Sequence, residues 1–354
     1  MKPTGIITDS IYLQHEMGSF HPESPERLNV IYEMLEQERT RLNLVDIPAR
    51  MATIEEISMN HDRRYVEQIA ATANRPHTYL DPDTSTCAYS WEAASKAVGG
   101  LFNLVDAVVG GTVRNGFAMV RPPGHHAEYR RAMGFCLFNN IALAARYALR
   151  VHGMRRVAVV DWDLHHGNGT QNAFYETNQV LFFSAHQFPH YPGTGRIAEV
   201  GKAEGEGYTV NIPLAGGAGD AEYLTVFHMV VAPIMEAFKP DLILVSAGFD
   251  AHYSDPLGGM RLTEDGYELM TQMLQHMAAN HCSERLIMTL EGGYNLDALR
   301  NSANRVISCL SQYDPNNESV PMEASFEDLV PSFANRLRDV VGAHRRYWPN
   351  LPQF

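Results

Sequence analysis

Residues 156–171 read Arg-Val-Ala-Val-Val-Asp-Trp-Asp-Leu-His-His-Gly-Asn-Gly-Thr-Gln, and this stretch decides the fold. Its apolar start predicts a buried strand over 157–160, which breaks abruptly into carboxylates and imidazoles. In an extended strand, residues two apart point the same way, so Asp161, Asp163 and His165 would share one face. Asp163 and His165 therefore form a natural pair of metal ligands.

Similar apolar runs recur along the chain and are separated mainly by helical or loop patterns. They cover 5–8, 44–48, 117–120, 180–183, 208–212, 242–245 and 286–290. Helical spacing appears over 25–38, 63–72 and 90–109, and Thr53 to Glu56 forms a capping box that opens a short helix. With 157–160, these runs predict about eight strands in the βαβ rhythm of a largely parallel sheet.

Composition excludes several classes of protein. The 354 residues are 45% apolar and 19% charged, which indicates a globular chain. The net charge of −13 argues against a nucleic-acid-binding protein, which would need a basic face. The four cysteines form no C-x-x-C pair, and neither a signal peptide nor an uninterrupted apolar span is evident. We therefore expect a cytoplasmic protein with no membrane role.

The domain organisation is expected to be simple. No internal repeat or low-complexity linker interrupts the chain, so residues 1–312 are predicted to form one catalytic domain. Residues 313–354 are predicted to form a loop and then an amphipathic helix containing Leu337, Val340 and Val341. This helix should pack on the domain or at a subunit contact, which leaves a homo-oligomer open.

Reactive groups gather just after the predicted strands, where ligands bind in open α/β sheets. Asp163 and His165 follow one strand, and Asp250 follows the strand at 242–245. Two carboxylates and one imidazole, with one position left open for water, are the pattern of a catalytic zinc site, and such a metal favours hydrolysis. The alternative is that these residues cap helices, and this alternative carries more weight for Asp250 than for the other two.

Two further strand ends carry polar side chains. His125 and His126 follow Pro122-Pro123-Gly124, and unligated imidazoles beside a metal are typical general bases. A single histidine would more often be a hydrogen-bonded core residue, but the pair favours function. Tyr294 follows two glycines, and its hydroxyl could stabilise an oxyanion or could simply be packed.

Weaker signals lie elsewhere. Gly216 to Gly219 contains three glycines before a helix but lacks the rest of a phosphate-binding loop, so a turn is predicted. His186 and His190 either line the same site or sit in a polar loop. The methionines between Met270 and Met277 predict the buried face of a helix.

Taken together, these motifs resemble the zinc-dependent histone deacetylase family, on the class II side, with its bacterial histone-deacetylase-like amidohydrolases and acetylpolyamine amidohydrolases. They appear in family order over nearly the whole chain. The matching stretches are His21-Pro-Glu-Ser-Pro-Glu-Arg27, Arg121-Pro-Pro-Gly-His-His126, Gly134-Phe-Cys-Leu-Phe-Asn-Asn140, Asp161-Trp-Asp-Leu-His-His-Gly-Asn-Gly-Thr170, Tyr191-Pro-Gly-Thr-Gly195, Ser246-Ala-Gly-Phe-Asp250, Asp255-Pro-Leu-Gly-Gly259 and Leu290-Glu-Gly-Gly-Tyr294.

The resemblance implies a single-domain arginase-deacetylase α/β fold with an eight-stranded sheet flanked by helices. It implies that Asp163, His165 and Asp250 bind Zn²⁺, with Fe²⁺ as an alternative metal. It further implies that His126 is the general base and then acid, that His125 is an electrostatic partner held by Asp161, and that Tyr294 binds the carbonyl. The implied substrate-binding residues are Gly134, Phe135, Tyr191, Leu257 and, at the rim, Asp81.

Two structural potassium sites are also implied by the resemblance. The first would use Asp161, Asp163, His165, Ser184 and Ala185. The second would lie near Phe174, Thr177, Val180 and Tyr208.

Two positions refine the expected function. Asn168 stands where class I members carry Asp, so the partner of His126 is neutral and should raise the pKa of that histidine less. Leu257 stands where polyamine-specific members carry an acidic gatekeeper, which favours acylated lysine as the substrate. The resemblance therefore implies an amidohydrolase that removes acetyl or other short acyl groups from lysine side chains. The alternatives are hydrolysis of acetylpolyamines or other small N-acyl amines and, less favoured, non-catalytic binding of acyl-lysine.

Overall fold

The computed structural model describes residues 2–314 and 330–354. The strands of the main sheet are β1 (Thr4–Ile7), β2 (Leu44–Asp46), β5 (Asn115–Ala118), β6 (Val157–Asp161), β7 (Val180–Gln187), β8 (Thr209–Leu214), β9 (Leu242–Ala247) and β10 (Leu286–Leu290). They are ordered β2-β1-β5-β10-β9-β6-β7-β8, and every pairing is parallel. The predicted eight-stranded parallel sheet is confirmed.

Strand boundaries differ from the prediction most at β7, which continues to Gln187 where 180–183 was predicted. Strand β5 begins at Asn115 and ends at Ala118, two residues earlier than the predicted 117–120. Its register is fixed on both sides, because Asn115 pairs with Thr4 of β1 and with Leu286 of β10. Met119 and Val120 lie beyond the end of β5 but are still buried. Their apolar character therefore reflects burial, and for this reason the predicted strand extended too far.

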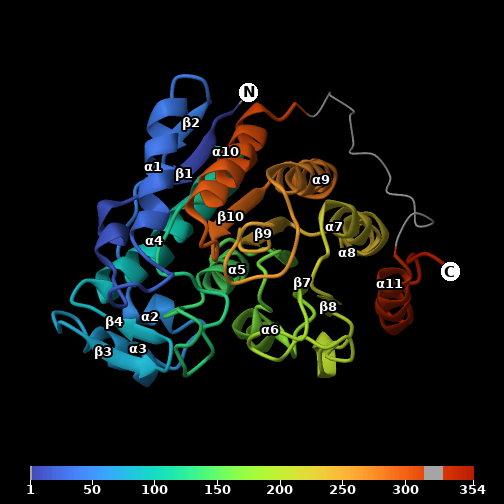
Figure 1. Cartoon of the computed structure of the whole chain (residues 1–354), viewed down its shortest axis with the longest axis horizontal. Helices are drawn as coiled ribbons and strands as arrows, with labels where there is room; N and C mark the ends of the chain where they lie inside the picture. Colours follow the sequence, from blue (N-terminus) through green and yellow to red (C-terminus); the bar gives the residue numbers. More distant parts are fainter. Residues whose placement is uncertain (1, 315–329) are drawn as a thin grey trace.

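Helices flank the sheet (Figure 1). The longer ones are α1 (Glu26–Glu38), α3 (Arg63–Ala70), α4 (Ser90–Val109), α5 (Asn140–Arg150), α9 (Glu264–Cys282), α10 (Leu296–Gln312) and α11 (Pro331–His344). The shorter ones are η1 (Ser10–Gln14), α2 (Ile54–Ile57), α6 (Asn168–Phe174), η2 (Ala203–Gly205), α7 (Asp220–Val226), the π-helical turn η3 (Phe227–Val231) and α8 (Ala232–Phe238). Helices α1, α10, α9 and α7 pack in succession, and α4 and α5 pack on each other and on the sheet.

Local sequence signals explain the start of α2 and the buried face of α9. The predicted capping box is present at α2, where the Thr53 hydroxyl accepts from the Glu56 N–H at 3.1 Å and the Glu56 carboxylate accepts from the Thr53 N–H at 2.8 Å. Met270 and Met273 of α9 are buried against the rest of the core, as their spacing predicted.

A small antiparallel sheet was not predicted from the sequence. It consists of β3 (Thr78–Asp81) and β4 (Thr84–Thr86), joined by a tight turn containing Pro82 and Asp83. The strands are short and β3 is only partly buried, so the alternation of polar and apolar residues gives little signal. This hairpin matters because its turn reaches the candidate site.

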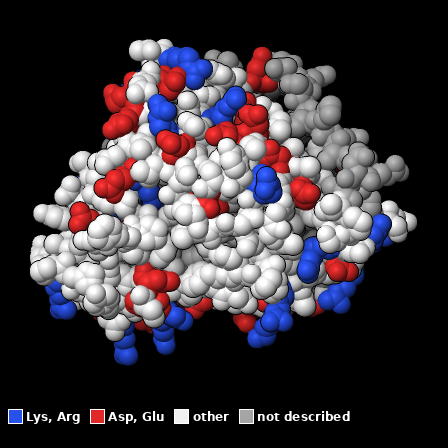
Figure 2. Space-filling view, viewed as in Figure 1, with Lys and Arg blue, Asp and Glu red and all other residues white. Residues whose placement is uncertain are grey.

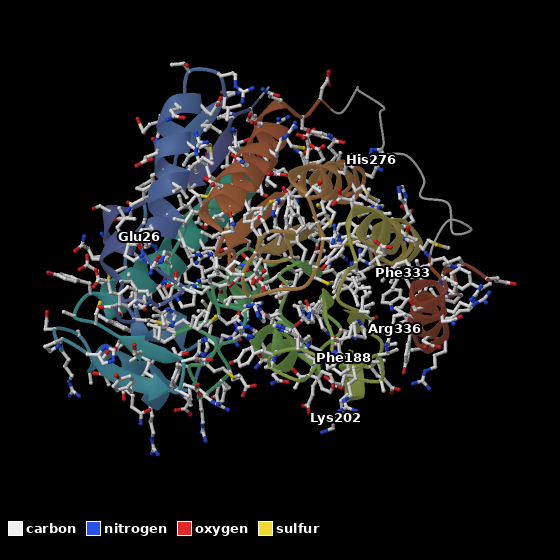
Figure 3. All side chains as sticks on the ribbon, viewed as in Figure 1. Glu26, Phe188, Lys202, His276, Phe333 and Arg336 are labelled. Atoms are coloured by element: carbon white, nitrogen blue, oxygen red, sulfur yellow. The ribbon has the colours of Figure 1, made fainter. Side chains whose placement is uncertain are left out.

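The C-terminal helix α11 packs against β8, the last strand of the sheet. Leu337, Val340 and Val341 are buried, as expected for the apolar face of this helix. Figure 3 labels Phe333 and Arg336 on the side of α11 that faces the domain, and Phe333 is buried. Of the loop predicted to begin at Tyr313, residues 315–329 lie outside the described part of the chain, and the domain boundary at 312 stays a prediction.

The distribution of surface charge and the apolar helices bear on the expectation that the protein binds neither nucleic acid nor membranes. Figure 2 shows acidic and basic side chains intermixed over the face in view. Among the described residues, one helical stretch, Asp220–Phe238, has the length and apolar composition of a membrane span. Half of that stretch is buried inside the fold, as is common for core helices, so it is weak evidence for a span.

Candidate active site

Four loops that carry reactive groups leave neighbouring strands. β5, β10, β9 and β6 are consecutive in the sheet, and all four are parallel, so their carboxyl ends meet at one edge. Asp161 ends β6 and is paired in register with Ser246 of β9. The structure thereby brings together the four strand ends whose side chains the sequence singled out.

Asp163, His165 and Asp250 form a buried cluster, and one ligand atom from each lies within 4.8 Å of the others. Nδ1 of His165 is 3.2 Å from Oδ1 of Asp163 and 3.1 Å from Oδ2 of Asp250. Backbone donors hold the carboxylates in place, because the Gly292 N–H donates to Asp163 at 2.8 Å and the Leu164 N–H donates to Asp250 at 2.9 Å. The set suits a divalent cation such as Zn²⁺.

Two glycines make room for this cluster. A Cβ at Gly292 would lie 2.2 Å from Oδ2 of Asp250, and one at Gly248 would lie 2.0 Å from Oδ2 of Asp163. Either contact is far shorter than van der Waals separation and would displace a carboxylate. The two glycines therefore leave this space to the carboxylates.

The electrostatics of the cluster favour a cation. Burial lowers the pKa of His165, but the hydrogen bonds and charges of Asp163 and Asp250 more than offset this and raise it to about 10. Burial and the neighbouring Asp163 charge raise the pKa of Asp250. Among the described residues these two buried carboxylates pair with histidines and with no Lys or Arg, and they therefore favour positive charge beside them.

The histidine pair has opposite environments. Nδ1 of His125 is 3.0 Å from Oδ2 of Asp161, and burial, which lowers its pKa, is outweighed by the Asp163 and Asp161 charges, which raise the pKa to about 10. Nδ1 of His126 is 2.7 Å from Oδ1 of Asn168, and its pKa is lowered by burial and by the neighbouring His125 and His165. Groups whose pKa values are pushed apart in this way are suited to separate acid–base roles.

Asn168 also determines which ring nitrogen of His126 carries the proton. Its side-chain Nδ2 donates to Glu128 at 2.8 Å, so its Oδ1 is the atom that accepts from Nδ1 of His126. Nε2 of His126 is then the unprotonated nitrogen, available to take a proton. The predicted neutral partner of His126 is in contact with it.

A cavity of about 220 Å³ lies over these groups. It is lined by Asp83, Pro123, His125, His126, Gly134, Phe135, His165, His190, Tyr191, Leu257, Gly292 and Tyr294. A Cβ at Gly134, whose φ is +56°, would lie 2.4 Å from Cδ2 of His126, so only glycine fits there. The aromatic ring of Phe135 stands edge-on to Tyr294 with ring centroids 6.0 Å apart, which gives the cavity a narrow apolar wall.

One predicted rim residue is placed elsewhere. Asp81 does not line the cavity; it pairs with Arg131 at 2.7 Å, and its neighbour Asp83 lines the cavity instead. The hairpin turn between β3 and β4 is the reason, because it directs Asp83 inward and leaves Asp81 on the strand. The sequence offers two aspartates two residues apart, and no local signal distinguishes them.

His186 and His190 are separated by the fold. His190 lines the cavity, whereas His186 is buried, and its Nε2 lies 3.0 Å from the Gly195 carbonyl oxygen. The loop Gly216 to Gly219 precedes α7, and its Gly219 capping interaction with Glu222 at 2.9 Å fits the predicted turn.

The residues expected at two potassium sites fall into two neighbourhoods. Asp161 and Ser184 are register partners on β6 and β7, and Ala185 follows on β7. Around the second, the Thr177 N–H donates to the Phe174 carbonyl at 3.2 Å and the Phe182 N–H of β7 donates to Tyr208 at 2.9 Å, close to Val180. Potassium binding at either place stays a prediction.

A second buried charged group, the Glu23 cluster, consists of Glu23, Arg27 and Arg121. Arg121 donates to both carboxylate oxygens of Glu23, with Nη2 at 2.8 Å from Oε2, and Arg27 donates to Oε1 at 3.0 Å. Arg27 also donates to the carbonyls of Gly293 and Glu291, both at 2.6 Å, and lies 5.0 Å from the centroid of the Tyr294 ring. The cluster was not predicted from the sequence, and it supports the loop that carries Tyr294.

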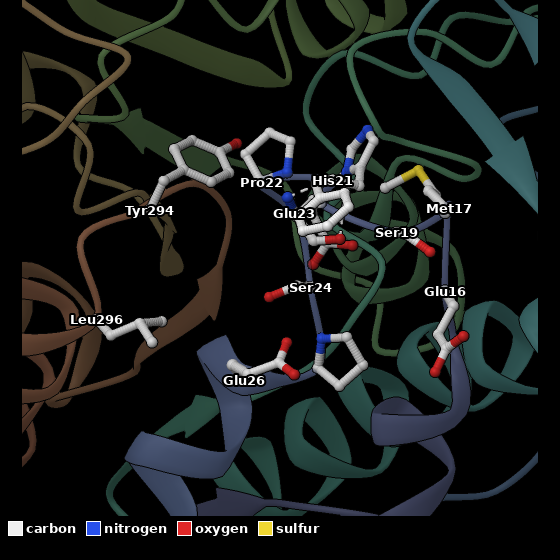
Figure 4. A pocket seen from close by; sticks show the side chains of 13 residues that line it. Glu16, Met17, Ser19, His21, Pro22, Glu23, Ser24, Glu26, Tyr294 and Leu296 are labelled. Atoms are coloured by element: carbon white, nitrogen blue, oxygen red, sulfur yellow. Dashed lines mark hydrogen bonds between the residues drawn. The ribbon is translucent and has the colours of Figure 1, made fainter.

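Tyr294 separates two hollows. One is the cavity over the metal ligands, and the other is a surface hollow of about 630 Å³ lined by residues 16–26, Tyr294 and Leu296. Figure 4 shows the Tyr294 ring at the wall of this second hollow, opposite Glu16 and Ser19. Burial raises the pKa of the Tyr294 phenol, so its hydroxyl keeps its proton and is a donor.

Comparison with known proteins agrees with this geometry. Residues 21–310 match the model of the histone deacetylase domain. Histone deacetylase 15 of Arabidopsis thaliana is 43% identical over 340 residues, covering 94% of this chain and 59% of that protein. A probable deacetylase of Archaeoglobus fulgidus is 36% identical over 355 residues, covering 98% of both proteins.

A solved structure gives the same result. The crystal structure of the HDA15 HD domain superposes with a TM-score of 0.91 at 40% identity, covering 99% of this chain and 96% of that one. The chain spans 59% of Histone deacetylase 15 but nearly all of the archaeal relative. The relationship supports deacetylase activity in general terms, which is a hydrolase activity. The chain belongs to the histone deacetylase family.

Proposed function

We propose that the protein hydrolyses the amide bond of acylated lysine side chains, releasing acetyl or another short acyl group as a carboxylate. The observation that carries this proposal is the arrangement around His126. Its free Nε2 faces a cavity that also contains the candidate metal ligand His165 and the Tyr294 phenol. A base, a cation site and a hydroxyl donor around one small cavity are the parts that amide hydrolysis requires.

The cation, proposed to be Zn²⁺ with Fe²⁺ as an alternative, would be held by Asp163, His165 and Asp250, and when bound supplies a more acidic water and a polarised carbonyl. The chain supplies the rest. Nε2 of His126 takes the proton from water as the water oxygen bonds to the acyl carbon. His126 then passes that proton to the nitrogen as the carbon–nitrogen bond breaks, and the amine leaves.

Tyr294 and His125 stabilise charge in this scheme. The Tyr294 hydroxyl donates to the carbonyl oxygen as negative charge develops on it. His125, held by Asp161, places positive charge beside His126, with ring centroids 4.0 Å apart, and so keeps the base neutral before reaction.

The shape of the cavity supports a slender, uncharged chain as the buried part of the substrate. Phe135, Tyr191 and Leu257 present apolar or aromatic surface, and the volume of 220 Å³ is below that of pockets for drug-sized ligands. The neutral Leu257 in the wall favours the aliphatic stem of lysine over a polyamine.

The test uses purified protein with an acetyl-lysine peptide, longer acyl-lysine peptides and acetylated polyamines, together with metal analysis. Turnover of the peptides is expected, and Tyr294→Phe should lower kcat by about 10²–10³-fold with unchanged metal content, because it removes one oxyanion donor. Full activity of Tyr294→Phe would contradict its role. Turnover of polyamines alone would reassign the substrate, and binding of acyl-lysine without any turnover would identify a reader.

A further inference from the structure

Asp255 is a buried carboxylate that the proposed mechanism does not use. It lies in the loop between β9 and α9, and the residue is 6% exposed. Its neighbours are the two walls of the catalytic cavity formed by Leu257 and Tyr294. A carboxylate held out of water at this place needs an explanation.

Backbone donors from both walls converge on this side chain. The Tyr294 N–H donates to Oδ2 of Asp255 at 2.7 Å, and the Asn295 N–H donates to the same oxygen at 3.2 Å. The Leu257 N–H donates to Oδ1 at 3.0 Å. One carboxylate therefore joins the loop after β10 to the loop after β9.

A second bond runs between the same loops. The side-chain Nδ2 of Asn295 donates to the Ser254 carbonyl at 3.1 Å, while its Oδ1 accepts from the Ala298 N–H at 3.0 Å and caps α10. The backbone on the carboxyl side of Tyr294 is thus anchored to a helix end as well as to Asp255.

Arg27 binds the Gly293–Tyr294 peptide group from the side opposite Asp255. It donates to the Gly293 carbonyl, which belongs to the same planar peptide group as the Tyr294 N–H. In a trans peptide these two atoms point in opposite directions, so a cation at the oxygen and an anion at the N–H fix the plane. Gly293 has φ of +119°, a conformation that few other residues adopt, so the direction of this peptide depends on a glycine at this position.

Tyr294 depends on its backbone for orientation. Within residues 2–314 and 330–354, its hydroxyl makes no hydrogen bond to the protein, as suits a donor kept for the substrate. A side chain whose polar end is reserved in this way can be aimed only through packing and the position of its own backbone.

We propose that Asp255 is a positioning residue that fixes the Gly293–Tyr294 peptide plane, and with it the aim of the Tyr294 hydroxyl, relative to the Leu257 wall. This inference rests on the proposed function, because the aim of the hydroxyl matters only if it donates to the reacting carbonyl. The carboxylate of Asp255 is needed for this role, since one of its oxygens accepts from two N–H groups at once and an amide nitrogen cannot accept from either.

The experiment is a double-mutant cycle in the metal-loaded protein, with Asp255→Asn, Tyr294→Phe and the double variant. Asp255→Asn replaces one acceptor oxygen by an NH2 group, which then faces either the Tyr294 and Asn295 N–H groups or the Leu257 N–H, so one side of the bridge is lost in either orientation. Misplacement by about 1 Å can cost up to roughly 10²-fold in rate. We expect kcat to fall at least about tenfold with KM and metal content near wild type. In the Tyr294→Phe background the further loss should shrink below about twofold, because the misplaced group is already absent.

Asp241→Asn is the matched control. Oδ2 of Asp241 likewise accepts two backbone N–H groups, from Arg155 at 2.8 Å and Arg156 at 3.0 Å, but lies at the amino ends of the strands. Its kcat should stay within about twofold of wild type. If Asp255→Asn does not fold, Asp255→Glu, which keeps the charge and both oxygens on a longer stem, enters the same cycle.

Equal losses of kcat in the wild-type and Tyr294→Phe backgrounds would overturn the inference, as would a loss explained by lower metal content. Those outcomes leave the proposed function standing, because wild-type turnover is measured in the same cycle. Absence of turnover by the wild-type protein on every acyl-amine substrate would instead remove the proposed function itself.

Discussion

Two groups of charged side chains are buried near the carboxyl ends of the strands, and they differ in balance. In the Glu23 cluster, one carboxylate is matched by two arginines, all within hydrogen-bonding distance. In the candidate metal site, Asp163 and Asp250 share His165, and Asp163 also lies 3.8 Å from Nε2 of His125. Among the described residues, no Lys or Arg pairs with either carboxylate. Burial of charge is common to both, so burial alone does not mark function. A better sign is a set of carboxylates paired with imidazoles, since both are metal ligands and a bound cation would balance the carboxylate charges.

The largest expected effect comes from removing a ligand. Asp250→Asn keeps the size of the side chain but removes its charge, so metal content should fall and kcat/KM should drop by more than about a hundredfold, beyond the roughly 10–100-fold typical of outer-shell partners. Metal analysis and steady-state kinetics measure both.

The same variant should not weaken the metal-free fold, because it relieves repulsion between two buried carboxylates. Its free energy of unfolding in chelator should equal or exceed that of metal-free wild type. A clear loss of stability with metal retained would mean that Asp250, like Glu23, stabilises the fold and does not bind the metal.

The Glu23 cluster should respond in the opposite way. Burial alone would raise the pKa of Glu23, but the charges and hydrogen bonds of Arg121 and the charge of Arg27 lower it to about 2, so the carboxylate is ionised when folded. Glu23→Gln leaves two buried arginines unmatched and should cost about 3–5 kcal/mol of unfolding free energy. Denaturant titration measures this cost.

Glu36→Gln is the control for this variant, because Glu36 pairs with Arg39 on the surface and should cost only about 0–1 kcal/mol. The folded fraction of Glu23→Gln should still bind metal. If Glu23→Gln and Glu36→Gln lower the free energy of unfolding equally, the Glu23 cluster would not be important for stability.

The smallest expected effect comes from changing Asn168, the neutral hydrogen-bond partner of His126. Asn168→Asp would place a carboxylate against Nδ1 of His126 and should raise the pKa of that histidine by about 1–3 units. Because the base must be unprotonated, the acidic limb of the pH–rate profile should move to higher pH, lowering activity below the new pKa.

Glu128 complicates that variant, since it accepts from Asn168 and would face a new negative charge. The pH profile is therefore also measured with Asn168→Asp and Glu128→Gln combined. An acidic limb that does not move in either protein would mean that another group controls the protonation of the base.

The sequence allowed the sheet and much of the site to be predicted, because both depend on local patterns. Alternating polar residues after an apolar run led to the prediction that Asp163 and His165 act together. They do lie together, although β6 ends at Asp161 and both residues belong to the bend that follows it, and the parallel sheet explains why Asp250 joins them. Each of these signals lies within a few neighbouring residues.

Other features depend on contacts between distant parts of the chain and left no local signal. Glu23 and Arg121 are separated by 98 residues, and each would pass for a surface charge when viewed alone. The choice of Asp83 over Asp81 depends on a tight hairpin turn between strands of three and four residues. The role proposed for Asp255 depends on three backbone N–H groups, which side-chain patterns cannot reveal.

The packing of α11 against β8 has a consequence for self-association. β8 is the last strand of the sheet, and its residues Val210, Ile212 and Leu214 are buried. An uncovered edge strand with apolar side chains is a template for pairing with another chain and for aggregation. A shortened protein ending before Pro331 should therefore precipitate or form higher-order species at concentrations where the full chain stays dispersed, even though every group proposed for catalysis would be retained.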